Sequence, residues 1–186
     1  MNKRLKRALT LGLVLLGIGI VTRTAQAAST DTMTLAVTPG NVTYGVSISS
    51  PYPSGYNFAQ VNLGATTAST VAILVTATGA TVSEYFGLAV SNTSGNWTAS
   101  ASAPSTDTFR MMGWFNTTPV STNTFITTDA FTNTVPAAAA GKYNQSSKTA
   151  PGTSANLWLR LDMPTALNLG TSAAQTMTLT VTGQPN

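Results

Sequence analysis

Residues 176–182 read Thr-Met-Thr-Leu-Thr-Val-Thr, in which apolar and hydroxyl side chains alternate with a period of two. Because successive side chains of a β-strand point to opposite faces, this period places Met177, Leu179 and Val181 on one face and the threonines on the other. Threonine suits a hydrated strand face, since its β-branch favours extended backbone while its hydroxyl remains in water. The segment predicts a strand with one face in the core and one in solvent.

A closely matching string lies near the start of the chain. Residues 32–38 read Thr-Met-Thr-Leu-Ala-Val-Thr and differ from residues 176–182 only at the fifth position. Threonine-rich strands converge easily in sequence, so we interpret the two strings as the terminal strands of one fold rather than as repeats.

Further short runs with alternating or wholly apolar character lie between these ends, each bounded by turn-forming residues. They fall at residues 42–49, 58–63, 70–77, 84–91, 96–100, 108–115 and 156–162. No helical period competes with them over a useful length. This pattern predicts an all-β chain whose antiparallel sheets form a β-sandwich of immunoglobulin-like or jelly-roll type.

Residues 116–154 differ from the rest because they are rich in Thr, Asn, Ala and Ser and have few apolar residues. We expect a long connection inside a single domain of residues 28–186, with a short hairpin or a helical turn around its few apolar residues. Long connections within compact domains often carry function.

The first residues have the three parts of a secretory signal peptide. A basic start, an apolar run over residues 8–21 and small residues at Ala25 and Ala27 predict an exported chain that is cleaved after Ala27. The apolar run is shorter than the roughly 20 residues that span a bilayer, so we expect no membrane span after cleavage. The predicted location is outside the cytoplasm, either secreted, at the cell surface or in the periplasm.

Removal of residues 1–27 leaves Arg110, Lys142, Lys148 and Arg160 as the only basic residues, against five acidic ones. Binding to nucleic acid requires clustered Lys and Arg, so this class of function is excluded. The nearly neutral charge also removes most of the repulsion between copies, which favours self-association.

The chain has no histidine and no cysteine, and most nucleophilic, redox and metal chemistry depends on one or the other. A glycosidase needs only two carboxyl groups, but no spacing selects a pair among the acidic residues available, which are Glu84, Asp107, Asp129 and Asp162. Asp107 is the only candidate calcium ligand, and a role in a turn suits it better. We therefore expect no enzymatic activity, no metal site and no cofactor.

Three aromatic residues are candidates for contact with a partner. In residues 157–161, Leu-Trp-Leu-Arg-Leu, the leucines share one face, so Trp158 points to the other. Trp158 either offers its indole to a sugar or a neighbouring subunit, or is covered by the long connection, and we favour the second because tryptophan is mostly buried. Tyr52 and Tyr56 lie in a predicted loop, where they would either grip a glycan or a subunit or pack on the rim of the domain.

Residues 62–79, followed by residues 84–90, resemble an element of secreted bacterial immunoglobulin-like domains, in which a Leu-Gly pair, small polar residues, a strand and a Thr-Gly turn open a hairpin. The chain after cleavage also resembles the TasA and camelysin group of jelly-roll fibre subunits from the biofilm matrix. That resemblance implies a sandwich fold and a role in a filament.

These observations predict a secreted, non-enzymatic structural protein that self-associates through its edge strands into a filament, surface layer or matrix. The alternative is a carbohydrate-binding module that uses Trp158, Tyr52 and Tyr56 to stack on a polysaccharide.

Overall fold

The computed structural model describes residues 44–49, 55–79, 81–93, 96–168 and 174–185, which all belong to one compact unit spanning Gly40–Asn186. Its strands are β1 (Val46–Ser49), β2 (Thr66–Ala68), β3 (Ile73–Ala77), β4 (Tyr85–Asn92), β5 (Thr98–Ala99), β6 (Thr108–Phe115), β7 (Ala130–Phe131), β8 (Ser154–Asp162) and β9 (Met177–Gln184). Three 3-10 turns complete it: η1 (Thr122–Thr124), η2 (Thr127–Asp129) and η3 (Lys142–Asn144). The prediction of an all-β chain built from antiparallel sheets is confirmed.

The larger sheet has the strand order β1-β3-β8-β6-β5, with β2 paired to β8 and β7 paired to β6. Every pair in it is antiparallel except β5 and β6, which run parallel. β8 is the central strand, and its register with β6 places Trp158 directly opposite Trp114.

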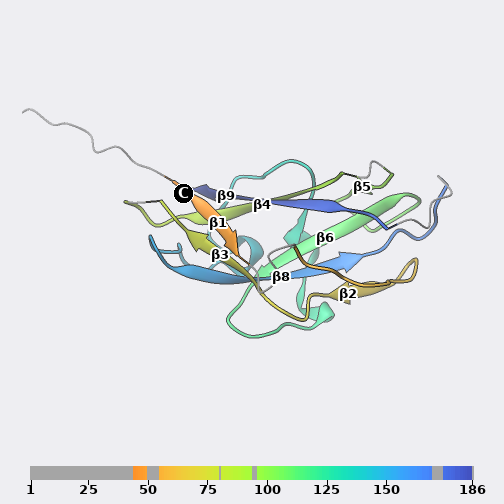
Figure 1. Ribbon diagram of the computed structural model, residues 1–186, viewed down its shortest axis with the longest axis horizontal. Coiled ribbons are helices and arrows are strands. Elements are labelled where there is room, and N and C mark those ends of the chain that lie inside the picture. The colour runs from red at the N-terminus through yellow and green to blue at the C-terminus, as the bar shows by residue number, and fades with distance from the viewer. Residues whose placement is uncertain (1–43, 50–54, 80, 94–95, 169–173, 186) are drawn as a thin grey trace, which may run out of the picture. The chain divides into compact units, whose positions relative to one another are not determined.

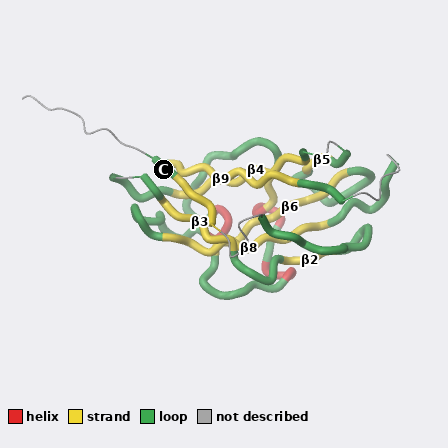
Figure 2. Tube along the Cα trace, viewed as in Figure 1, coloured by secondary structure: helices red, strands yellow, loops and turns green. Residues whose placement is uncertain are grey.

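The smaller sheet contains only β4 and β9 among the described strands, and its antiparallel register runs from Tyr85 opposite Gln184 to Asn92 opposite Met177. Figure 1 shows this sheet lying over the strands β6 and β8, and Figure 2 shows the same two layers with the helical turns confined to the connecting segments. A shared hydrophobic core joins the sheets, with Leu88 and Val181 from the smaller sheet against Val75 and Leu159 from the larger one.

The side-chain alternation predicted for β8 and β9 is confirmed. Leu157, Leu159 and Leu161 are all buried in the core between the sheets. On β9 the core contains Val181, and the half-buried Met177 and Leu179 pack against it. Thr178 and Thr180 are exposed on the opposite face, so the last strand has the two faces that its sequence predicts.

One predicted strand is wrong. Residues 58–63 form a loop, in which Ala59 adopts the left-handed conformation with φ 57° and its N–H bonds to the Asn57 side chain at 2.8 Å. The apolar residues of the run instead face two ways, because Phe58 packs against the core while Leu63 is 48% exposed. A short apolar run alone therefore does not determine whether a segment forms a strand.

Other predicted strands are shorter in the structure than in the sequence pattern. β1 begins at Val46, β3 at Ile73, and β5 has two residues, whereas β6 has the predicted bounds. The predicted signal peptide, the site of cleavage and the strand at residues 32–38 lie outside the described residues.

Candidate functional site

The two edges of the smaller sheet differ. In an antiparallel pair, alternate residues bond to the partner strand, and the residues between them direct their N–H and C=O groups away from it. On β4 the N–H of Val90 bonds to the Thr132 carbonyl, which lies outside the sheet. The backbone N–H and C=O groups of the even-numbered residues of β4 therefore point away from β9. The register then directs the backbone groups of Met177, Leu179, Val181 and Gly183 to the outer edge of β9.

The long connection covers the outer edge of β4. Phe86 donates its N–H to Gln145 Oε1 at 2.7 Å, and Gln145 Nε2 donates to the Phe86 carbonyl at 2.8 Å. Glu84 and Thr149 exchange two further backbone bonds of 3.0 and 2.8 Å. A second strand therefore has no free position on this side, which is how native sheets protect an edge from unwanted pairing.

The same connection also folds onto the outer face of β4. A Cβ on Gly87 would meet Val135 Cγ1 at 2.7 Å, so only glycine permits this close approach. Gln184 fixes the segment by accepting a bond from the Ala138 N–H at 2.7 Å and by donating to the Pro136 carbonyl at 3.3 Å.

The described residues provide no such cover for β9. Among the described residues, β4 is the only strand that pairs with β9, and no hydrogen bond is formed at the outer edge by the backbone groups of Met177, Leu179, Val181 or Gly183. An edge of this length with unpaired N–H and C=O groups is a template for the addition of another strand.

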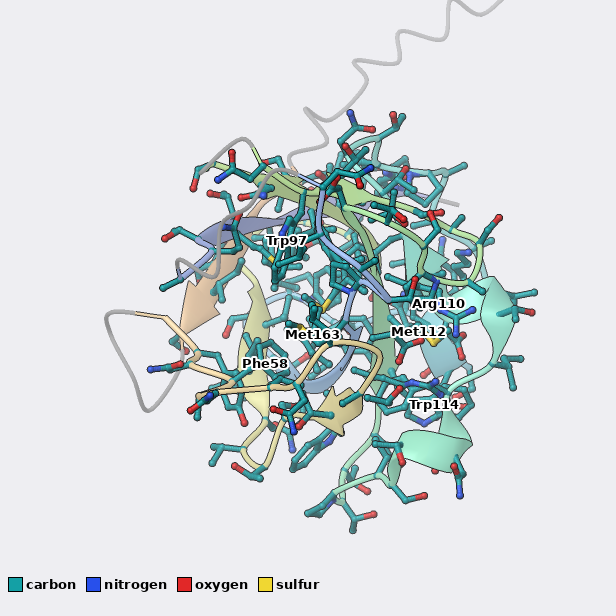
Figure 3. The ribbon with its side chains drawn as sticks, turned by 90° about the vertical axis from the view of Figure 1, so that its right-hand side faces the viewer. Phe58, Trp97, Arg110, Met112, Trp114 and Met163 are labelled. Carbon is teal, nitrogen blue, oxygen red and sulfur yellow. The ribbon has the colours of Figure 1, made fainter. Side chains whose placement is uncertain are left out.

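A groove of about 1060 Å³, lined by apolar and uncharged polar residues, lies between the layers beside this edge. Both sheets and the loop at residues 55–63 line it, and their side chains include Ile48, Tyr56, Phe58, Val61, Ile73, Val90, Trp97, Met111, Leu159, Leu161, Met163, Met177 and Leu179. The described lining includes no charged residue. Figure 3 shows Phe58, Trp97 and Met163 on the same side of the molecule, apart from Trp114.

Within the described residues, the groove contains one polar group without a hydrogen-bond partner and one exposed apolar side chain. The indole Nε1 of Trp97 is buried without a hydrogen-bond partner, and Ile48 from β1 is 44% exposed although it lines an apolar surface. Ile48 is therefore accessible at the rim of the groove, whereas core residues in the lining such as Val90 and Leu159 are buried.

Trp158 does not contribute to this groove. It is 4% exposed and packs with Phe125 and Ala130 on the other side of β8, where its Nε1 donates to the Asn116 carbonyl at 2.9 Å. The long connection thus covers Trp158, which is the arrangement favoured from the sequence, and its indole is not exposed.

Tyr56 is half-buried and lines the groove, where its ring packs edge-on against Phe58 with centroids 4.8 Å apart. Its hydroxyl accepts a bond from the Thr70 N–H at 2.8 Å. Packing within the domain therefore accounts for Tyr56. Tyr52 lies outside the described residues, and of the two that are described only Tyr56 lines the groove.

Asp162 is held by two ion pairs, with Arg110 at 2.6 Å and Arg160 at 2.7 Å, and by the Thr66 hydroxyl at 3.0 Å. Burial disfavours its charged form, but the bonds from Arg160, Arg110 and Thr66 outweigh that effect and hold its pKa below the usual value. Arg160 also donates to the Thr122 carbonyl at 2.8 Å. The cluster therefore fixes the long connection to β8.

The other described acidic residues have separate structural surroundings. Burial raises the pKa of Asp129, which accepts a bond from the Ile126 N–H at 2.8 Å, and Asp107 accepts one from the Asn168 N–H at 3.0 Å. Burial likewise raises the pKa of Glu84, whose side chain is fully buried and whose carboxyl oxygens lack a hydrogen-bond partner. The nearby Gly45 backbone N–H offsets part of that rise without forming a bond of good geometry.

Over the described part of the chain, no group of three or more acidic side chains converges as a metal site would require. The helical elements described there include none that is long and apolar enough to cross a membrane. No protein-family model, no curated protein and no solved structure matches this chain.

The groove was not predictable as a site from the sequence. Its loop has the pattern of a strand, and Trp97 and Met163 come from segments with no recognisable motif. The one signal available was the number of apolar residues in residues 55–63, which a loop on the surface does not need.

Proposed function

We propose that this chain is a non-enzymatic structural protein of the cell exterior, a β-sandwich subunit that self-associates by addition of a strand to β9 and so builds a filament, layer or matrix. The observation that carries the proposal is the contrast between the edges of the smaller sheet. The edge of β4 is occupied by Gln145 and its neighbours, whereas the edge of β9 is unpaired within the described residues.

The groove supports the same function. Strand addition supplies main-chain hydrogen bonds, and its affinity increases where alternate side chains of the added strand enter pockets. The outer edge of β9 lies next to such a surface, since Met177 and Leu179 belong to both the strand and the lining of the groove.

The small net charge of the predicted exported form also supports self-association. The predicted exported form has nearly equal numbers of acidic and basic residues, and two of its arginines already pair with Asp162. Little electrostatic repulsion therefore opposes the close approach of copies.

The test uses the chain of residues 28–186 and two lysine variants at adjacent positions of β9. Leu179→Lys places a charge in the groove, whereas Thr180→Lys places the same charge on the exposed face. We expect the native chain and Thr180→Lys to form polymers that are visible by negative-stain microscopy and sedimentation, and Leu179→Lys to remain monomeric with an unchanged circular dichroism spectrum. A native chain that stays monomeric at every concentration would overturn the proposal.

A further inference from the structure

The sequence contains several Asn-x-Ser/Thr triplets, the pattern that N-glycosylation requires in an exported chain. Their asparagines are Asn41, Asn92, Asn96, Asn116 and Asn144. Such triplets also arise by chance in a chain rich in Asn, Ser and Thr, so accessibility in the fold has to distinguish them. An acceptor asparagine needs an amide that can be reached and a triplet that lies in a surface segment outside the packed core.

Two of the triplets take part in the packing of the smaller sheet. Asn92 is half-buried at the end of β4, and its side-chain amide donates to the Trp97 carbonyl at 3.2 Å and to Gln175 Oε1 at 3.0 Å. In the triplet that begins at Asn96, the middle residue is Trp97, which lines the groove with its indole Nε1 buried. Drawing out either triplet would break these contacts.

Asn144 is exposed, but its side-chain amide is used by the fold. It lies in η3 with a φ of 61°, and its Nδ2 donates to the Phe115 carbonyl at 2.8 Å. A glycan on this amide would disturb a contact between the long connection and the end of β6. Asn41 lies outside the described residues.

Asn116 has the surroundings that an acceptor needs. It directly follows β6, and Thr117 and Thr118 are both exposed. Its Nδ2 donates to the Thr118 carbonyl at 2.9 Å and to the Thr118 hydroxyl at 3.1 Å, so the printed bonds of this amide stay within its own triplet. The backbone is anchored separately, because its N–H donates to the Asn156 carbonyl at 3.1 Å and its carbonyl accepts from Trp158 Nε1.

The side chain of Asn116 lies on the outer face of the larger sheet. The bond to Asn156 continues the register in which Phe115 lies opposite Leu157. Phe115 is buried in the core between the sheets, so the next residue points to the opposite face, which is also the face of Trp114. Trp114 is half-buried, and the accessible part of its indole gives the apolar side of a sugar ring a surface to pack on.

We propose that Asn116 is an N-glycosylation site, with the first sugar packed beside Trp114. The donor is a glycan linked to a polyprenyl diphosphate. Nδ2 bonds to the anomeric carbon of the glycan, the bond from that carbon to the diphosphate oxygen breaks, and the polyprenyl diphosphate leaves with the electron pair. Nδ2 loses one proton to a base of the transferase. It keeps its second N–H, which can still donate to the Thr118 carbonyl.

This inference goes beyond the proposed function and is compatible with it. The described lining of the groove includes none of residues 114–118. Figure 3 shows Trp114 apart from Phe58 and Trp97, which both line the groove. A glycan on Asn116 would therefore project from the outer face of the larger sheet and leave the edge of β9 free for another strand.

The experiment examines the chain as isolated from the cells that encode it. Cleavage after Lys and Arg places Asn116 in the peptide of residues 111–142, which contains no other Asn-x-Ser/Thr triplet, and places Asn144 in the peptide of residues 143–148. We expect mass spectrometry to find the 111–142 peptide heavier by a series of sugar residues and the 143–148 peptide unmodified.

Four variants expressed in the same cells define the linkage. Asn116→Gln keeps an amide but removes the acceptor, and Thr118→Val removes the hydroxyl of the triplet, so both are expected to lose the glycan. Thr118→Ser restores the hydroxyl and is expected to retain it. Thr117→Val is the matched control, because it makes the same change at the middle position and leaves the triplet intact.

The position of the first sugar has its own measurement. In the glycosylated chain, sugar protons that lie over the indole of Trp114 are expected to shift upfield in NMR spectra, and Trp114→Leu is expected to keep the glycan and lose the shift. Sugar protons with the same chemical shifts in both chains would overturn the placement beside Trp114.

The assignment of Asn116 is overturned if the 111–142 peptide is unmodified in the native chain. A glycan that persists in Asn116→Gln would show attachment to a hydroxyl and would overturn it as well, as would a glycan that persists in Thr118→Val. Because each of these results is read from peptide masses and not from polymerisation, they leave the proposed function to its own test.

Discussion

The side-chain amide of Gln145 exchanges two hydrogen bonds with the backbone of Phe86 and so occupies a position on β4 that another strand would otherwise take. Gln145 is buried, and it comes from a connection that lies 59 positions away in sequence. This contact closes the β4 edge of the smaller sheet, whereas no described strand occupies the outer edge of β9.

Gln145→Leu removes both bonds and leaves a buried N–H and a buried C=O on Phe86 without partners. We expect a loss of about 2–6 kcal/mol in the free energy of unfolding, measured by urea denaturation, because each of the two groups costs about 1–3 kcal/mol. Gln60→Leu, on an exposed glutamine, is the control and is expected to change stability by less than about 0.5 kcal/mol. Equal effects of the two variants would contradict this role of Gln145.

The strands were predictable to the extent that their side chains alternate. Residues 108–115 and the leucines of β8 have a clear local pattern, and the structure agrees with it. The capping of β4 by Gln145 and the fit of Val135 against Gly87 were not predictable, because each depends on residues that are distant in sequence. The prediction of a strand at residues 58–63 failed because a loop over a groove can be as apolar as a strand.

Glu84 makes stability depend on pH. Because burial raises its pKa above 4.5 in the folded protein, the folded state holds this proton more tightly than the unfolded state. The contribution of Glu84 to the free energy of unfolding is fully present below its pKa in the unfolded state. It is lost as the pH rises through its pKa in the folded state. Glu84→Gln cannot ionise, so we expect it to be more stable than the native chain at neutral pH, by a margin that shrinks toward pH 4 in thermal denaturation. A difference that does not vary with pH would contradict this.

Asp162 has the opposite dependence. Its pKa is lowered, so its contribution is present above the unfolded value of 3.8 and is lost as pH falls through the folded pKa. Asp162→Asn leaves Arg110 and Arg160 without their carboxylate, and we expect a loss of about 3–5 kcal/mol at pH 7. The difference from the native chain should narrow in denaturation curves measured at about pH 2, and a constant difference would show that charge is not responsible.

We expect substitution of Trp158 to lower the stability of the fold and not to affect glycan binding. Trp158→Ala removes a buried indole from the cluster with Met112, Phe125 and Ala130, which costs about 3–5 kcal/mol in cores of this kind. Trp114→Ala, at the half-buried residue opposite it, is expected to cost less. A Trp158→Ala variant of native stability that loses retention on an insoluble polysaccharide would restore the carbohydrate-binding alternative.

Amide hydrogen exchange along β9 tests the central claim most directly. In dilute monomer, we expect the amides of Thr178, Thr180 and Thr182, which bond to β4, to be protected, and those of Met177, Leu179 and Val181 to exchange quickly. In the assembled form, all six are expected to be protected. Slow exchange of Leu179 in the monomer, or fast exchange of Leu179 in the assembly, would contradict an open edge that a second copy completes.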